Sequence, residues 1–235
     1  MTDQKKIVIL GGGESGIGAA LLAKAKGFDV FVSDSGSLKE EYKKPLTLSN
    51  IPFEEGTHSE ERILAADEIV KSPGIPEKAD IIQKARKAKI KISSEIEFAG
   101  RFTNAKMVCI TGTNGKTTTT LLTYHLLKKA GLNVKMAGNI GNSFAAEVLS
   151  DCTKDQEHTK DLIYVLEISS FMLDDMHDFK ADIGILTNIT PDHLDRYDYK
   201  IEKYVDSKLR ILQNMDEKSI FIYGIDSELI ENSLF

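Results

Sequence analysis

Short apolar runs rich in β-branched residues alternate with helical stretches along this 235-residue sequence. Four early runs are predicted as buried strands: KIVIL (6–10), DVFVSD (29–34), DEIVKS (67–72) and IKISS (90–94). The stretches GIGAALLAKAKG and KADIIQKARKAK between them have helical periodicity. Strand–helix alternation of this kind favours a parallel sheet with helices on its faces, so the predicted fold class is α/β.

The same pattern begins again further along the chain. It includes KMVCITG (106–112), DLIYVLEIS (161–169), ADIGILTN (181–188) and KSIFIYG (218–224). The restart predicts a boundary in or just before FAGRFTNAK (98–106), between a Rossmann-like domain over residues 1–98 and a P-loop ATPase-like α/β domain over 99–235. The polar run SDCTKDQEHTKD (150–161), which contains His158, is predicted as a surface loop.

Composition excludes several classes of protein. The net charge is −6 without a basic stripe, so a nucleic-acid partner is not expected. Two cysteines, Cys109 and Cys152, form neither a disulfide framework nor a zinc site. The N-terminal apolar run is too short for a secretory signal, and no segment approaches a membrane span. We expect a cytoplasmic monomer without membrane insertion.

The segment GTNGKTT (112–118), here called the P-loop, follows a predicted strand and opens a predicted helix. It has two residues between its glycines where the common pattern has four, yet the required chemistry is present. Its glycines let backbone N–H groups point at phosphate oxygens beside a helix N-terminus. The lysine can reach β- and γ-phosphates, and the following hydroxyl can join a magnesium shell. The predicted nucleotide-binding residues are Gly112, Thr113, Asn114, Gly115, Lys116, Thr117 and Thr118.

A second segment, GGGESGIG (11–18), here called the glycine loop, satisfies G-x-G-x-x-G between a strand and a helix. Asp34 ends the next strand, near the position of a ribose-binding acid. This pattern is typical of an NAD(P) enzyme, but the same turn can hold any diphosphate, including that of a UDP-sugar. An NAD(P) enzyme would leave Lys116 of the P-loop unexplained.

Polar side chains follow two further predicted strands. Glu167 ends IYVLE, where a carboxylate beside a P-loop can hold Mg²⁺, although a strand-end glutamate can also cap a helix. The segment LTNITPDHLDRY (186–197) concentrates Asn188, Asp192, His193 and Asp195. Open α/β sheets bind ligands at this end of their strands, which favours an active-site role for His193. Position and charge alone assign no role to Lys208 in YVDSKLRIL.

Five segments occur in the order found in one family: TGTNGKTT, GNIG (138–141), LEISSF, NITPDHLDRY and YVDSKLRI. The sequence thereby resembles the Mur ligases, the ATP-dependent amide-bond synthetases of peptidoglycan precursor assembly. Within that family it is most similar to the branch that adds D-glutamate, through GGGESG, SPGI (72–75), SSEIEF (93–98) and the short first domain.

The resemblance implies that the first domain binds the UDP part of UDP-N-acetylmuramoyl-L-alanine rather than NAD. It places Ser15 and Gly16 near the diphosphate and Asp34 and Ser35 near the uracil. The full set of substrate-binding residues that it implies is Ser15, Gly16, Asp34, Ser35, Ser72, Gly74, Asn139 and His193.

The resemblance also implies ATP and Mg²⁺ in the second domain. Lys116 would bind ATP phosphates, Thr117 and Glu167 would serve the first Mg²⁺, and His193 a second. Lys208 matches a family lysine that is carbamylated, which gives an amine the oxygen atoms of a magnesium ligand. The implied catalytic residues are Lys116, Glu167, His193 and Lys208.

The implied reaction activates the L-alanyl carboxylate as an acyl phosphate, which the amine of D-glutamate then attacks. The family's SSFQL is SSFML here, so any polar contact made at Met172 is in doubt. Family members carry a third, C-terminal domain, so we expect these 235 residues to bind the UDP substrate without completing ligation. The alternatives are another Mur-type ligase, a folylpolyglutamate-type synthetase, or an NAD(P)-binding protein.

Overall fold

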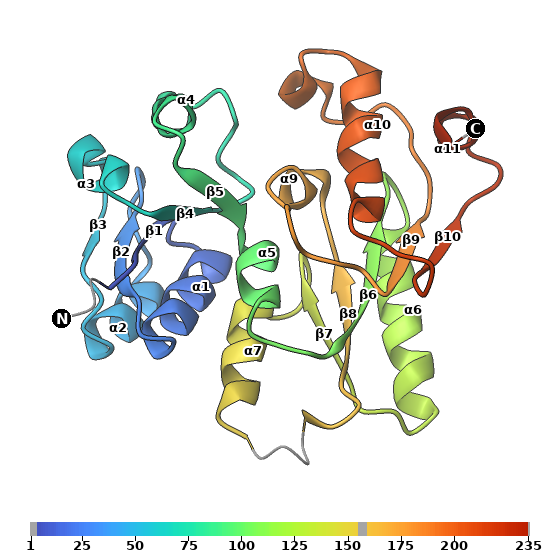
Figure 1. The fold of residues 1–235 in the computed structure, drawn as a ribbon, viewed down its shortest axis with the longest axis horizontal. Helices are drawn as coiled ribbons and strands as arrows, with labels where there is room; N and C mark the ends of the chain where they lie inside the picture. Colours follow the sequence, from blue (N-terminus) through green and yellow to red (C-terminus); the bar gives the residue numbers. More distant parts are fainter. Residues whose placement is uncertain (1–3, 155–158, 235) are drawn as a thin grey trace. The chain divides into compact units, whose positions relative to one another are not determined.

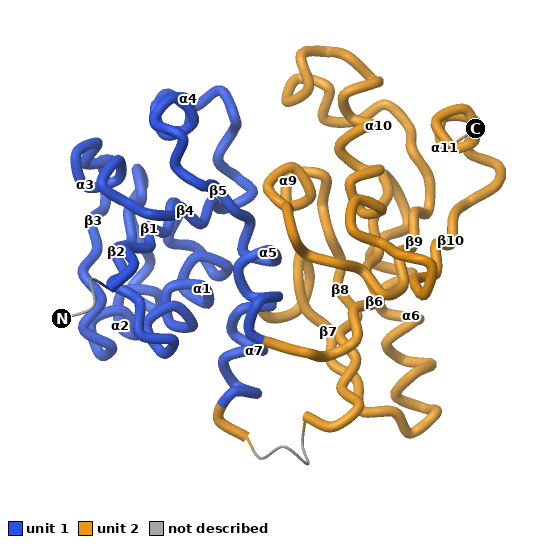
Figure 2. The backbone as a smooth tube through the Cα atoms, in the orientation of Figure 1, with its two compact units in different colours: residues 1–102, 143–152 blue, residues 103–142, 153–235 orange. Residues whose placement is uncertain are grey.

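The computed structural model describes residues 4–154 and 159–234, and it divides the chain into two compact units. Unit 1 contains residues 1–102 and 143–152, and unit 2 contains 103–142 and 153–235 (Figure 2). Unit 1 is therefore built from two separate stretches of chain, whereas the two predicted domains were continuous. Of the predicted surface loop, residues 150–152 are helical, and 155–158, with His158, lie outside the described residues.

Unit 1 is built on a parallel sheet of five strands in the order β3-β2-β1-β4-β5 (Figure 1). The strands are β1 (Lys6–Leu10), β2 (Asp29–Ser33), β3 (Phe53–Glu54), β4 (Glu68–Lys71) and β5 (Lys91–Ser94). Its helices are α1 (Glu14–Ala25), α2 (Glu40–Leu48), α3 (Glu60–Leu64), α4 (Asp80–Lys87), α5 (Glu95–Gly100) and α7 (Phe144–Cys152). The strand order changes direction beside β1, which is where doubly wound sheets form a ligand-binding crevice.

Alternate residues of each strand face opposite sides of this sheet, and both sides are apolar. Val8 and Leu10 of β1 belong to a buried cluster with Ile63 of α3 and Ile82 of α4. Ile7 and Ile9 are buried as well, at 1% and 0% exposure. Because side chains on both faces are covered, the strands read as continuous apolar runs.

Helix α7 packs with unit 1 through small residues on α1. A Cβ added at Gly18 of α1 would lie 2.0 Å from Ser143 Oγ and 3.1 Å from Ala146 N. Ser143 in turn caps α7, because its hydroxyl accepts a hydrogen bond from Ala146 N–H at 3.1 Å. Glycine at position 18 is thus required for the close approach of the two helices.

Unit 2 has a second parallel sheet in the order β10-β9-β6-β8-β7 (Figure 1). Its strands are β6 (Lys106–Thr111), β7 (Val134–Gly138), β8 (Ile163–Glu167), β9 (Ile183–Leu186) and β10 (Ile220–Tyr223). Its helices are α6 (Lys116–Lys129), α9 (Ser170–Leu173), η1 (Leu194–Tyr197), α10 (Ile201–Leu209), η2 (Arg210–Leu212) and α11 (Glu228–Leu234). The P-loop connects the central strand β6 to α6.

The predicted α/β class is confirmed, and each run predicted as a strand contains one. The sequence did not predict β3, which is two residues long, or β7, whose VKMAG alternates poorly. Within the described parts of the chain, no helix has the length and apolar character needed to cross a bilayer.

Candidate nucleotide-binding and catalytic site

The P-loop backbone adopts conformations that favour glycine at two positions. Gly112 has φ 144° and Gly115 has φ 79°, both in the region that residues with a Cβ rarely occupy. A Cβ at Gly112 would also lie 1.9 Å from Thr187 Oγ1. Gly115 is the N-cap of α6, so the loop ends at a helix N-terminus, where backbone N–H groups attract anions.

The loop is fastened to the segment that follows β9. Asn114 N–H donates to Asn188 Oδ1 at 2.9 Å, and Asn188 Nδ2 donates back to Asn114 O at 3.1 Å. Thr113 N–H donates to Asn188 O at 2.9 Å. The Thr187 hydroxyl donates to Asn114 O at 2.7 Å. These hydrogen bonds hold the loop in one shape before any ligand binds.

Two lysines distant in sequence converge on one P-loop carbonyl. Lys116 Nζ donates to Gly112 O at 3.0 Å and to Thr113 O at 2.9 Å. Lys208 Nζ donates to the same Gly112 O at 2.9 Å. The P-loop therefore brings two lysine amines to one carbonyl oxygen.

Lys208 is buried although it carries an amine. Its side chain is 1% exposed, and its Nζ lies 4.7 Å from the centre of the Tyr204 ring. Burial, together with the nearby charge of Lys116, lowers the pKa of Lys208 to about 7, against the opposing effects of Asp192 and Asp174. A large share of this amine is thus uncharged and nucleophilic near neutral pH.

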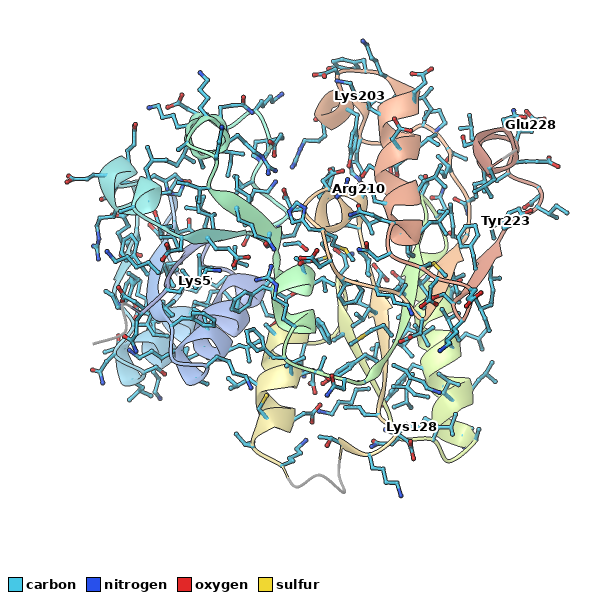
Figure 3. All side chains as sticks on the ribbon, viewed as in Figure 1. Lys5, Lys128, Lys203, Arg210, Tyr223 and Glu228 are labelled. Atoms are coloured by element: carbon cyan, nitrogen blue, oxygen red, sulfur yellow. The ribbon has the colours of Figure 1, made fainter. Side chains whose placement is uncertain are left out.

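Helix α10, which carries Lys208, is held in place at its C-terminal end. Arg210, which follows α10 (Figure 3), donates through Nε to Leu173 O at 2.8 Å and through Nη2 to Met176 O. Met172 itself is buried, at 4% exposure, so its thioether packs in an apolar environment.

Glu167 lies at the end of β8, beside the strand that leads into the P-loop. Ile110 of β6 pairs with Glu167 in the sheet register. Glu167 Oε1 accepts a hydrogen bond from Asn139 Nδ2 at 2.7 Å, so Asn139 orients the carboxylate. Glu167 Oε2 is buried without a hydrogen-bond partner among the described residues.

A buried carboxylate oxygen without a donor is unfavourable by itself and is the ligand type that Mg²⁺ prefers. The exposed Thr117 hydroxyl at the start of α6 is a second oxygen available to a cation. These residues fit a magnesium ion. Over residues 4–154 and 159–234, however, no three His, Cys, Asp or Glu side chains gather as a ready-made metal cluster.

The contacts of the His193 side chain are with Asp192 and Phe171 rather than with Glu167 or Lys208. Its backbone has φ 50°, its side chain is 56% exposed, and its Nε2 lies 3.6 Å from Asp192 Oδ2. Its ring lies 5.3 Å from that of Phe171. The exposed imidazole is accessible to a ligand, and its role stays a prediction.

In unit 1 the glycine loop follows β1 as predicted. A Cβ at Gly16 would lie 1.9 Å from Gly11 O, so α1 can start close to the loop only with glycine there. Ser72, after β4, donates through Oγ to Gly11 O at 3.3 Å. The loop, the first turn of α1 with Ser15, and the end of β4 thus meet at the carboxyl edge of the sheet.

Asp34 binds the loop backbone. Its Oδ2 accepts from Gly12 N–H at 2.6 Å, and its Oδ1 accepts from Gly36 N–H at 2.7 Å. Both oxygens thereby shape the turns that follow β1 and β2. A contact of Asp34 with a ribose or uracil stays a prediction.

A cavity of about 440 Å³ lies at the same edge of unit 1 and is here called the edge cavity. It is lined by Ser35, His58, Glu60, Gly74, Ile75, Pro76, Ala79, Asp80 and Ile81. Its volume is within the range of small-ligand sites. The structure thus brings together Ser35 and Gly74, two of the residues predicted from the sequence to bind substrate.

Sequence reasoning missed Thr187, Tyr204 and His58. Tyr204 OH lies 3.2 Å from Thr113 Oγ1, and this contact joins residues 91 positions apart. The position of Thr187 directly after a strand was a usable signal, because β9 pairs with β6 next to the P-loop. No local pattern distinguishes Tyr204 or His58.

The fold and the site together define a nucleotide-binding α/β protein with a P-loop. Two family models match the chain: "Mur ligase middle domain" over residues 110–234 and "MurD N-terminal domain" over residues 6–81. The chain therefore belongs to the Mur ligase family, as its motifs predicted.

Curated relatives carry the name UDP-N-acetylmuramoylalanine--D-glutamate ligase. The chain is 55% identical over 230 residues to the protein of Bacteroides fragilis, covering 98% of this chain and 50% of that protein. It is 56% identical over 224 residues to the protein of Porphyromonas gingivalis, covering 95% and 48%. The chain thus spans about half the length of the curated relatives it matches.

Solved structures of the same family share the fold. The UDP-N-acetylmuramate:L-alanyl-gamma-D-glutamyl-meso-diaminopimelate ligase of Neisseria meningitides matches with a TM-score of 0.64 at 17% identity, covering 99% of this chain and 75% of that one. A murein peptide ligase of Psychrobacter arcticus matches with a TM-score of 0.58 at 20% identity, covering 98% and 51%.

Proposed function

We propose that the whole protein is an ATP-dependent amide-bond-forming ligase that adds D-glutamate to UDP-N-acetylmuramoyl-L-alanine in the cytoplasm, for cell wall synthesis. Unit 2 binds ATP, and unit 1 binds the UDP-linked substrate. The observation that carries the proposal is the P-loop, where Lys116 and Lys208 both donate to Gly112 O. Glu167, with its unpartnered oxygen, ends the strand next to the one that leads into this loop. The names of relatives at 55% and 56% identity favour D-glutamate as the amino acid.

In the proposed reaction the L-alanyl carboxylate attacks the γ-phosphorus of ATP, and ADP leaves. The amine of D-glutamate then attacks the acyl carbon of the acyl phosphate and loses a proton, and inorganic phosphate leaves. Lys116 Nζ exchanges its two carbonyl partners for phosphate oxygens, and the N–H groups at the start of α6 stabilise negative charge on the transferred phosphoryl group.

Thr117, Glu167, His193 and a carbamylated Lys208 would hold Mg²⁺, which neutralises phosphate charge when bound. Asn139 keeps the Glu167 carboxylate oriented through its 2.7 Å hydrogen bond. Carbamylation requires an uncharged amine, and the pKa of Lys208, lowered by burial to about 7, is consistent with that requirement. Bicarbonate labelled with ¹³C should give a carbamate NMR signal that K208M lacks.

Calorimetric titration tests whether unit 1 binds the UDP-linked substrate and unit 2 binds ATP. The 235-residue chain should bind UDP-N-acetylmuramoyl-L-alanine and UDP saturably and should not bind NADH. K116M should keep the UDP affinity and lose that for a non-hydrolysable ATP analogue by at least about tenfold, because a charged contact to phosphate is removed. Binding of NADH without UDP would overturn the assignment of unit 1.

The reaction itself is tested by phosphate release. An enzyme that contains this chain should release phosphate from ATP only when both the UDP substrate and D-glutamate are present. Release that depends equally on another amino acid would assign a different Mur-type ligase. Release by these 235 residues alone would refute the expectation that they bind without completing ligation.

A further inference from the structure

The edge cavity of unit 1 has walls that suit a flat, uncharged ring better than a phosphate. Ile75, Pro76, Ala79 and Ile81 provide apolar surface. The carboxylates of Glu60 and Asp80 outnumber the single Lys84 amine that pairs with both, so the wall disfavours an anion. The glycine loop and the N-terminus of α1, by contrast, favour a diphosphate. A nucleotide bound to unit 1 would therefore place its base in the edge cavity.

One lining residue, His58, belongs to a hydrogen-bonded chain that starts at the end of β2. Ser33 Oγ donates to Glu54 Oε1 at 2.6 Å and lies 2.7 Å from His58 Nδ1. Glu54 Oε1 also accepts from Ser59 N–H at 2.7 Å, and its Oε2 accepts from the Ser59 hydroxyl. Ser33 is fully buried, whereas Glu54, His58 and Ser59 are half-buried, so the centre of this chain is shielded from solvent.

The direction of this chain fixes which nitrogen of His58 carries the proton. An ionised carboxylate can only accept, so the single proton of the Ser33 hydroxyl points to Glu54. Burial raises the pKa of Glu54, but hydrogen bonds from Ser33 and Ser59 outweigh this and lower it, which keeps the carboxylate ionised. The short contact to Ser33 Oγ must then be donated by His58 Nδ1–H. In neutral His58, Nε2 is consequently a bare acceptor.

The charged groups around His58 interact with other partners, so its Nε2 is available to a ligand. The carboxylates that line the cavity with it, Glu60 and Asp80, are both paired with Lys84, at 2.6 Å and 2.8 Å. Arg62, in α3, lies over the Phe31 ring at 3.7 Å and lowers the pKa of Glu54. In the described part of the chain, Nε2 of His58 forms no hydrogen bond.

We propose that His58 is a specificity-determining residue, whose Nε2 accepts a hydrogen bond from the imide N–H of a uracil base held in the edge cavity. Ser33 and Glu54 are positioning residues that keep Nε2 in the acceptor form. The proposal rests on the proposed function, because it assumes a UDP-linked substrate in unit 1. The proposal adds a physical reason why unit 1 would bind uracil more tightly than cytosine.

Uracil and cytosine differ at the atom that would meet Nε2. N3 of uracil carries a hydrogen and donates, whereas N3 of cytosine is an acceptor with a lone pair. An acceptor on His58 pairs with the first and repels the second. One neutral hydrogen bond to a half-buried side chain corresponds to roughly a tenfold difference in affinity.

The test is calorimetric titration with UDP, CDP and N3-methyl-UDP at pH 8.5, above the range in which histidine ordinarily titrates. UDP should bind about tenfold tighter than either other nucleotide. In H58N the asparagine amide can still donate to Ser33, but Nε2 is removed. H58N should therefore bind UDP about tenfold more weakly, bind CDP no more weakly than the unsubstituted chain does, and lose most of the penalty for the N3-methyl group.

H125N is the matched control, since His125 is exposed on α6 of unit 2, and it should leave all three affinities unchanged. Circular dichroism of H58N should match that of the unsubstituted chain. If UDP binds but H58N keeps the UDP-to-CDP ratio, His58 only fastens its loop and the inference is wrong while the proposed function stands. If UDP does not bind at all, the proposed function of unit 1 fails as well.

Discussion

At the scale of single residues, the proposed catalytic role of Lys208 comes with a cost in stability. Its amine is 1% exposed, and burial lowers its pKa to about 7 from 10.5. Unfolding lets it regain a proton, so Lys208 opposes folding at neutral pH, and its unfavourable contribution grows as pH falls towards 7. K208M should raise the free energy of unfolding at pH 7 by about 1–3 kcal/mol while abolishing ligation.

Urea unfolding of K208M and of the unsubstituted chain checks this prediction. K203M is the control, because Lys203 lies on the same helix with a side chain that is 50% exposed and paired with Asp198 at 2.6 Å. K203M should change stability by less than about 1 kcal/mol. A destabilised K208M would show that the bond to Gly112 O outweighs the burial of the amine.

Glu95 makes the stability of unit 1 depend on pH, with a sign opposite to that of the effect of Lys208. Its side chain is buried, its Oε1 accepts from Ala145 N–H at 2.5 Å, and its Oε2 has no partner among the described residues. Burial raises its pKa to about 7 against these hydrogen bonds. Its contribution to stability is therefore complete below about pH 4.5 and is lost as pH rises through 7.

E95Q keeps an acceptor for Ala145 and removes the ionisation. The free energy of unfolding of the unsubstituted chain should fall by about 2 kcal/mol more than that of E95Q between pH 5 and pH 8. Thermal or urea unfolding across this pH range measures the difference. Parallel curves for the two proteins would mean that Glu95 does not titrate on folding.

At the scale of elements, helix propensity predicts that alanine in place of Gly18 stabilises α1. The packing of α1 on α7 predicts the opposite effect. Alanine in place of an interior helix glycine ordinarily gains about 0.5–1 kcal/mol. At Gly18 the added Cβ would lie 2.0 Å from Ser143 Oγ, the cap of α7. G18A should instead cost about 1–3 kcal/mol, the usual cost of overpacking.

Gly74 provides the control for G18A. A Cβ there meets no atom within 4 Å, so G74A should change stability by less than about 0.5 kcal/mol. Differential scanning calorimetry of both variants gives the comparison. A stabilised G18A would indicate that α7 can shift away from α1 without loss.

The elements also show what the sequence could predict. Short, continuous apolar runs such as KIVIL predicted β1 with its observed bounds, because burial on both faces leaves a continuous apolar signal. The P-loop was predicted because its chemistry is local to seven consecutive residues. The membership of α7 in unit 1 could not be predicted, because it depends on contacts with α1 and α5 rather than on the residues of α7 alone.

The site residues also differ in how well the sequence predicts them. Lys116 was predicted from the P-loop pattern and Glu167 from its place at a strand end, whereas the hydrogen bond of Lys208 joins it to Gly112, 96 positions away. His58 lies in a loop with no repeating pattern, and its tautomer follows from Ser33 and Glu54, which are 25 and 4 positions away. Long-range pairing of this kind carries no local signal.

At the scale of the whole molecule, the chain passes between the two units three times, at residues 102–103, 142–143 and 152–153. Helix α7 is thus part of unit 1 although β7 and β8, its neighbours in sequence, belong to unit 2. Each unit has its own sheet, so a ligand of one unit stabilises the elements of that unit directly.

This arrangement predicts which segments each ligand protects from amide hydrogen exchange. UDP at about 100 times its Kd should add about 2.7 kcal/mol to the opening free energy of β1, β4 and α7. A non-hydrolysable ATP analogue should protect β6, β8 and the start of α6, and should leave α7 unchanged. Mass spectrometry of exchanged peptides distinguishes α7 from β8. Protection of α7 by the ATP analogue alone would show that the helix follows its neighbours in sequence rather than the unit on which it packs.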